Sequence, residues 1–104
     1  MAIIQRRVFY GKVGAAEDLV AWANEMYSVI RVNSPAISHR VLSDYQSGQT
    51  DRVVVEIEVE NMAQIDEALG KTMADPNTQK QFADVFSRLG SLIDRAEVEQ
   101  WTIH

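Results

Sequence analysis

The chain has 104 residues, 46% of them hydrophobic and 24% charged, a composition that predicts a single globular domain over residues 1–104 with a modest core. Cysteine is absent, which excludes disulfides, thiolate zinc sites, iron–sulfur clusters and cysteine nucleophiles. The net charge of −5 disfavours binding to nucleic acid, and no window approaches the roughly 20 apolar residues of a membrane span, so we expect a cytoplasmic protein with no nucleic-acid or membrane partner.

The chain opens with a predicted strand and a predicted helix. Alternation over residues 3–10 indicates the strand, whose two faces carry Gln5, Arg7 and Phe9 and, opposite, Ile4, Val8 and Tyr10. Gly11-Lys-Val-Gly14 reads as the turn that follows. Apolar residues at three- and four-residue spacing then predict a helix that ends near Pro35, with a stripe made of Leu19, Trp22, Ala23, Met26, Tyr27 and Ile30.

Two predicted strands joined by a polar turn come next. The first runs from Ala36 to Tyr45, and residues 46–50 suit an antiparallel hairpin. The second runs from Asp51 to Glu60, where Val53, Val55, Ile57 and Val59 alternate with Val54, Glu56, Glu58 and Glu60. One face of this strand is therefore apolar and faces the core, while the other carries carboxylates and needs a partner.

The C-terminal part of the chain predicts two helical segments and a last strand. Asn61 and Gln64 form a capping-box-like start, and Asp75-Pro76 reads as a second N-cap with proline at the first helical position. The helical region is thus kinked or broken near Pro76, and Gly90 is its expected end. Residues 96–103 alternate in character as the final strand.

The order of these elements predicts an α+β fold. Strand, helix, strand, strand, helix, strand is the ferredoxin-like split βαβ (βαββαβ), an antiparallel four-stranded sheet with helices on one face. Its other face is uncovered, with the glutamates of residues 51–60 and with arginines from the first two strands opposite or adjacent. Since unpaired buried carboxylates are costly, we expect two copies to pair across this face as a dimeric α/β barrel, with Glu56, Glu58 and Arg40 at the interface.

His39 is the candidate proton carrier, because histidine titrates near neutral pH. Strand pairing offers Glu56 or Glu58 as a neighbour, and a carboxylate that holds an imidazole is a beginning of acid–base chemistry. A structural or interface role for His39 is the alternative. The same groups offer oxygen and nitrogen ligands to a metal, but a salt-bridged strand face explains them more simply, and we expect neither a metal nor a cofactor.

Aromatic side chains gather on the faces where the predicted helices meet the sheet. They either complete the core or line a pocket for a small apolar or aromatic ligand, whose polar contacts would be tyrosine hydroxyls, indole N–H groups and Arg7. The residues that we expect around such a pocket are Trp22, Tyr27, Phe86 and Trp101.

The whole chain resembles the dimeric α/β-barrel superfamily. Arg6-Arg-Val-Phe-Tyr-Gly-Lys-Val-Gly14 and the closing Glu99-Gln-Trp101 resemble NIPSNAP-type small proteins, and next to them antibiotic-biosynthesis-monooxygenase-like proteins. The resemblance implies a homodimer with a cavity between helices and sheet; some members are cofactor-free monooxygenases, haem-degrading enzymes or isomerases. Residues 62–95 lack the histidine that holds haem iron in relatives, and Asn24 near Trp22 matches the monooxygenase Asn–Trp pair only by composition.

The sequence therefore predicts a small homodimer that binds a small, partly apolar molecule. As an enzyme it would be a cofactor-independent monooxygenase or an isomerase, with His39 carrying a proton and Tyr10 or Arg7 stabilising an oxyanion. The alternative is a non-enzymatic binding or interaction module of the NIPSNAP type. A ligand-sized cavity that touches His39 or Tyr10 favours the enzyme, and a filled core favours the module.

Overall fold

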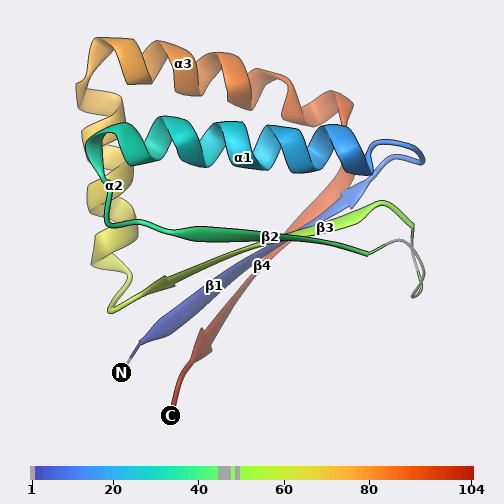
Figure 1. Ribbon diagram of the computed structural model, residues 1–104, viewed down its shortest axis with the longest axis horizontal. Helices are drawn as coiled ribbons and strands as arrows, with labels where there is room; N and C mark the ends of the chain where they lie inside the picture. The colour runs from blue at the N-terminus through green and yellow to red at the C-terminus, as the bar shows by residue number, and fades with distance from the viewer. Residues whose placement is uncertain (1, 45–47, 49) are drawn as a thin grey trace.

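The computed structural model describes residues 2–44, 48 and 50–104 as a four-stranded sheet with helices on one side (Figure 1). None of the helices in this described part is long and apolar enough to cross a membrane. In chain order the elements are β1 (Ile3–Gly11), α1 (Ala16–Asn33), β2 (His39–Asp44), β3 (Arg52–Val59), α2 (Ala63–Ala74), α3 (Pro76–Ser87), the 3₁₀ turn η1 (Leu89–Ser91) and β4 (Ile93–Thr102).

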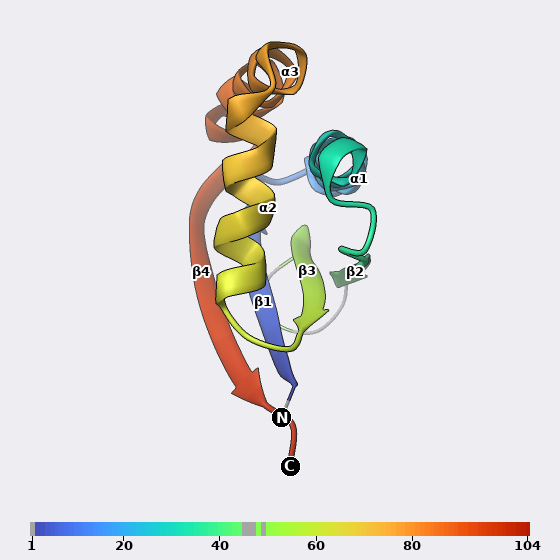
Figure 2. The same cartoon turned by 90° about the vertical axis from the view of Figure 1, so that its left-hand side faces the viewer.

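The sheet has the strand order β2-β3-β1-β4, and all neighbouring strands are antiparallel. The two central strands, β1 and β3, are neighbours although α1 and β2 separate them in sequence, which is the split βαβ arrangement. Figure 2 shows the helices on one side of the sheet and none on the other. The predicted ferredoxin-like architecture is therefore confirmed.

The core lies between the sheet and α1, and it follows the predicted apolar stripes. Leu19 on α1 and Val53 on β3 are both 0% exposed, and the alternate β3 residues Val55, Ile57 and Val59 are buried with them. α1 packs on β2 and β3, whereas α2 and α3 pack mainly on α1 and on each other. The apolar face assigned to residues 51–60 is thus the core face.

The turn between β1 and α1 closes on the start of β3. A Cβ atom at Gly11 would lie 2.5 Å from the carbonyl oxygen of Asp51, so only glycine fits, and Gly14 has a φ of +89°. The Asp51 carboxylate accepts a 3.1 Å hydrogen bond from the backbone N–H of Ala16 and so caps α1 from a distant segment. Hydrogen bonds from the backbone of Gly14 and Ala16 lower the pKa of Asp51.

Pro76 breaks the helical region into α2 and α3, as predicted. Asp75 is extended and its carboxylate accepts a 3.0 Å hydrogen bond from the backbone N–H of Asn77, which starts α3. The ends of two strands differ from the prediction. β2 begins only at His39, because the chain turns between Ser34 and Ile37, where the N–H of Ile37 donates to the Ser34 carbonyl; β4 begins earlier, at Ile93. Most of the predicted hairpin turn, 46–50, lies outside the described residues.

Candidate functional site

A cavity of about 180 Å³ lies between the helices and the sheet and opens partly to solvent. Its floor is the helix-facing side of β1, and its walls come from α1, α2 and α3. The lining includes Gln5, Arg7 and Phe9 of β1, Trp22, Met26, Tyr27 and Ile30 of α1, Ile65, Ala68 and Leu69 of α2, and Phe82 and Phe86 of α3.

The cavity exists because α2 and α3 do not pack closely on the strands beneath them. The break at Pro76 turns the chain so that α2 runs across the side of the domain and α3 runs back beside α1 (Figures 1 and 2). Both helices pack against α1, which itself packs on β2 and β3. The helix-facing side of β1 is therefore left as the floor of a hollow rather than as a packed layer.

Two polar side chains of β1 face this apolar hollow. Gln5 and Arg7 are two residues apart on one strand, so both point to the helix side. Gln5 is only 5% exposed, and no hydrogen bond joins its side-chain amide to any described residue. Arg7 lies at the open side, and no carboxylate of the described residues forms an ion pair with it. The cavity thus offers hydrogen-bonding groups and a cation for which the described residues supply no partner.

Tyr27 is the third polar residue of the lining. Its side chain is 9% exposed, and burial raises the pKa of its phenol, a shift that the positive charge of Arg7 opposes. No hydrogen bond links the Tyr27 hydroxyl to another group in the described part of the chain. The phenol is therefore neutral at physiological pH and free to donate a hydrogen bond inside the cavity.

Trp22 contributes a ring but no free donor. Its indole Nε1–H donates a 2.7 Å hydrogen bond to the backbone carbonyl of Val85 on α3, and its ring meets Phe9 edge to face with centroids 5.4 Å apart. The expectation that an indole N–H would contact a ligand is wrong for Trp22, because this N–H ties α1 to α3. Its ring is nevertheless a fixed wall of the cavity.

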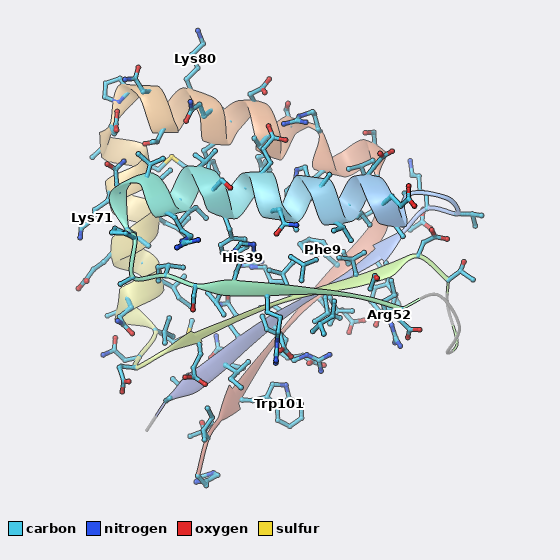
Figure 3. The ribbon with its side chains drawn as sticks, viewed as in Figure 1. Phe9, His39, Arg52, Lys71, Lys80 and Trp101 are labelled. Carbon is cyan, nitrogen blue, oxygen red and sulfur yellow. The ribbon has the colours of Figure 1, made fainter. Side chains whose placement is uncertain are left out.

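His39 lies beside the cavity rather than in it. Its ring stacks on Tyr27 at a centroid distance of 4.8 Å, and it is placed between α1 and the sheet in Figure 3. Its strand partner is Ile57, so Glu56 and Glu58 point to the opposite face, and the expected imidazole–carboxylate pair is not formed. Adjacent strand residues alternate between faces, so the neighbours of Ile57 on β3 cannot reach the imidazole from the other side of the sheet.

Asn24 takes the place of that carboxylate. Its side-chain oxygen lies 2.8 Å from His39 Nε2, which therefore donates, and the other ring nitrogen, Nδ1, is buried without a hydrogen-bond partner among the described residues. Burial chiefly, and then the positive charge of Arg31, lower the pKa of His39. The imidazole is thus held neutral in one tautomer. No local sequence pattern indicates this pair, because α1 and β2 bring the two residues together only in the folded domain.

Tyr10 and Trp101 lie on the other face of the sheet, away from the cavity. Tyr10 follows Val8 and Arg6 on the uncovered side of β1, where Arg95 stacks over its ring at 4.2 Å. Trp101 shares the uncovered side of β4 with Glu99, and Figure 3 shows it beyond the sheet from the helices. The structure therefore corrects the placement of both residues in a site with Arg7. Of the expected pocket residues, Trp22, Tyr27 and Phe86 do line the cavity.

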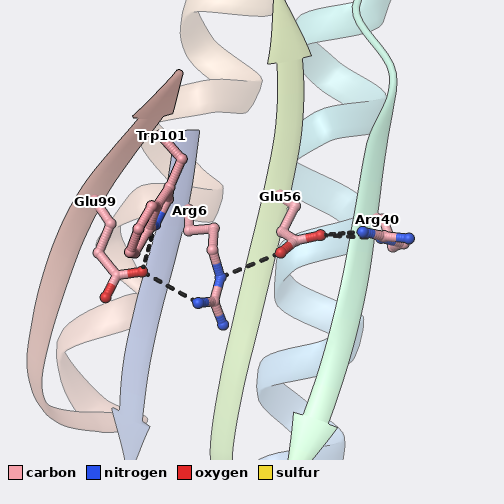
Figure 4. A network of polar contacts seen from close by, with 5 residues as sticks. All are labelled: Arg6, Arg40, Glu56, Glu99 and Trp101. Carbon is pink, nitrogen blue, oxygen red and sulfur yellow. Dashed lines mark hydrogen bonds and ion pairs between the residues drawn. The ribbon is translucent and has the colours of Figure 1, made fainter. Parts of the chain in front are cut away.

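The uncovered face carries a chain of ion pairs (Figure 4). Glu56 on β3 lies 3.1 Å from Arg6 and also pairs with Arg40, and Arg6 donates to Glu99 at 3.2 Å. The Trp101 indole N–H donates to the same Glu99 carboxylate at 3.1 Å. The expected proximity of Glu56 and Arg40 is confirmed, and Glu58 lies on the same face. Within the described residues no group of acidic and histidine side chains has the arrangement of a metal site.

No protein-family model matches the sequence, and no curated protein does. The structure, in contrast, is similar to solved structures. A NIPSNAP family protein from Agrobacterium tumefaciens matches with a TM-score of 0.76 at 14% identity, over 99% of this chain and 86% of that one. A NIPSNAP domain protein from Burkholderia xenovorans matches with a TM-score of 0.76 at 14% identity, over 98% of this chain and 94% of that one. SnoaB, a cofactor-independent oxygenase from Streptomyces nogalater, matches with a TM-score of 0.68 at 16% identity, over 98% of this chain and 92% of that one.

Identities this low establish the fold and no more. The chain has a ferredoxin-like fold, and NIPSNAP proteins and a cofactor-independent oxygenase are among the solved structures that share it. The predicted resemblance to NIPSNAP-type and monooxygenase-like proteins is therefore confirmed as a similarity of fold.

Proposed function

We propose that this protein is a homodimer that binds a small, partly apolar molecule in the cavity between its helices and its sheet. The observation that carries the proposal is the hollow of about 180 Å³ itself, with an apolar lining and a buried Gln5 amide that has no partner in the described chain. A filled core would have argued for an interaction module only. A preformed apolar pocket with a few convergent polar groups is the usual form of a small-molecule site.

Ligand-induced thermal shifts test this proposal. A ligand that binds only the native state at 100 times its Kd raises the free energy of unfolding by about 2.7 kcal/mol. Ala68 on α2 is 4% exposed and lines the cavity, so Ala68→Leu should fill the space and abolish the shift. Ala83→Leu makes the same change at an exposed position of α3 and should leave the shift unchanged. Single-ring and fused-ring aromatics that give no shift with the wild type would contradict the proposal.

The homodimer is argued from the uncovered face of the sheet. Leu42 and Trp101 on this face are 42% and 56% exposed, while the charges around Glu56 are neutralised by Arg6 and Arg40 within the chain. A second copy can cover such a face without leaving an unpaired carboxylate, so the desolvation penalty is reduced.

Light scattering at micromolar concentration tests the dimer. Leu42→Glu places a carboxylate on the proposed interface and should give a monomer. Val13→Glu adds the same charge in a turn where the side chain is 93% exposed, and it should remain a dimer. A wild-type monomer would refute this part of the proposal.

An oxygenase activity is a second candidate, and Arg7 is the observation that favours it. The fold is shared with a cofactor-independent oxygenase, and a guanidinium in the cavity lining that no described carboxylate pairs with suits the stabilisation of a substrate oxyanion. Such a reaction would oxidise a phenol to a quinone: one atom of O₂ becomes the new carbonyl oxygen, and the other leaves as water with the two hydrogens that the substrate loses, so the substrate itself is the reductant. His39 and Tyr10, the other residues expected to act, do not touch the cavity, so binding without chemistry is the better supported function. Oxygen consumption with phenols that shift the melting temperature would establish the enzyme.

A further inference from the structure

We propose that the ligand of this cavity is a single-ring aromatic acid, with its ring among the aromatic walls and its carboxylate held by Arg7 and Gln5. The inference rests on the proposed function, that the cavity binds a small molecule, and adds the chemical class of that molecule. Three features of the site support it: the volume of the cavity, the charge of Arg7, which no described carboxylate neutralises, and the aromatic side chains that form the walls.

The size of the cavity limits the ligand to about one ring. An engineered apolar cavity of about 150 Å³ in another protein accepts benzene, and pockets for drug-sized ligands begin at roughly 300 Å³. The present cavity, at about 180 Å³, falls just above the first value and well below the second. A benzene ring fits the enclosed part, and its substituent reaches the open side.

The charge of the ligand is inferred from Arg7. Five arginines of this chain, Arg6, Arg40, Arg52, Arg88 and Arg95, lie within ion-pair distance of a carboxylate. Arg7 is the neighbour of the paired Arg6 but points to the other side of the sheet, and no described carboxylate pairs with it. The positive charge at the cavity is therefore not neutralised by the described chain, and an anion is the ligand that it attracts.

Two neutral donors accompany that charge. The Gln5 amide offers two N–H donors and the Tyr27 hydroxyl offers one, and neither group has a hydrogen-bond partner in the described structure. A guanidinium binds a carboxylate with two parallel N–H···O bonds, which uses both oxygens and leaves lone pairs for further donors. Gln5 and Arg7 stand about 7 Å apart along β1, as their two-residue spacing dictates, so one carboxylate fits between their side chains.

The walls favour a flat ring. Phe82 and Phe86 of α3 are nearly parallel, with an interplanar angle of 10° and centroids 6.0 Å apart, and Phe86 is 57% exposed at the open side. Trp22 and Phe9 stand edge to face deeper in the site. Aromatic faces and edges gain most from a further aromatic ring, by offset stacking or by edge-to-face contact.

The test compares benzoate with benzamide, which has nearly the same shape and no charge, by isothermal titration calorimetry. We expect the wild type to bind benzoate at least about tenfold more tightly, the ratio given by one charge-assisted hydrogen bond of roughly 1.4 kcal/mol. Arg7→Met should reduce this ratio to about one, and Arg7→Lys, which keeps the charge without the planar fork, should give an intermediate ratio. Arg31→Met removes an arginine that does not line the cavity and should leave the ratio unchanged.

The outcomes separate this inference from the function beneath it. Equal binding of benzoate and benzamide by the wild type, or an undiminished preference in Arg7→Met, would overturn the anionic ligand and leave the apolar site standing. If toluene, benzamide and benzoate all fail to bind, the site itself is refuted. Cyclohexanecarboxylate that binds as tightly as benzoate would overturn the aromatic requirement.

Discussion

Filling the cavity should stabilise the free protein, and the substitution Ala68→Leu measures this directly. Ala68 is buried on α2 and faces the hollow, so the added carbon atoms enter empty space rather than occupied core. Three extra methylene-sized groups at about 0.8 kcal/mol each give about 2.4 kcal/mol, and the lost rotamer freedom of leucine removes about 0.5–1 kcal/mol. The expected net gain is about 1.5 kcal/mol.

Urea denaturation and thermal melting supply the assay. For a domain of this size a gain of about 1.5 kcal/mol corresponds to a rise in Tm of roughly 6–10 °C. The exposed control Ala83→Leu should change stability by less than about 0.5 kcal/mol. A loss of about 1–3 kcal/mol in Ala68→Leu is the cost of overpacking, and would mean that no open cavity exists beside α2 in solution.

Three further predictions concern contacts around the site. Trp22→Phe removes the hydrogen bond to the Val85 carbonyl and should cost about 1–3 kcal/mol in urea denaturation, whereas an unchanged midpoint would show that the bond is not formed. Folding lowers the pKa of Asp51, so the ionised carboxylate stabilises the protein above its ordinary pKa of 3.8, and this stabilisation is lost as the pH falls through the folded-state pKa. Asp51→Asn should therefore flatten the decline of stability in that acid range. A decline of equal slope in the variant would contradict the capping contact. The pKa of His39 is also lowered, from 6.5, so neutral His39 contributes stability above that pH and the contribution is lost on acidification; an NMR titration that returns a value above 6.5 would contradict the partly buried, Asn24-bonded imidazole.

The strands and their faces could be predicted because their chemistry is local. Val53 and Val55 alternate with Val54 and Glu56, and a period of two is enough to decide which side chains enter the core. The same parity shows that Tyr10 cannot share a site with Arg7, since two residues an odd number of positions apart on a strand point to opposite faces. Parity in the sequence is therefore sufficient to separate these two residues, whatever their chemical type.

The remaining features depend on contacts that no local pattern encodes. Asp51 caps α1 from the start of β3, and Asn24 holds His39 across the gap between α1 and β2. The hollow over β1 arises from how α2 and α3 rest on α1, which depends on the packing of whole helices. Sequence patterns assign residues to faces, but they do not determine whether the space between two faces is filled.

The two tryptophans provide the most direct measurement of the central claim, because the structure places one of them in the cavity and the other on the opposite face. A ¹H–¹⁵N NMR titration with benzoate follows both indole N–H signals at once, and Trp101→Phe assigns them. We predict a saturable shift of the Trp22 signal, from the ring current of the bound aromatic, with the Trp101 signal unmoved. A titration that moves only the Trp101 signal, or neither, would contradict a ligand site between the helices and the sheet.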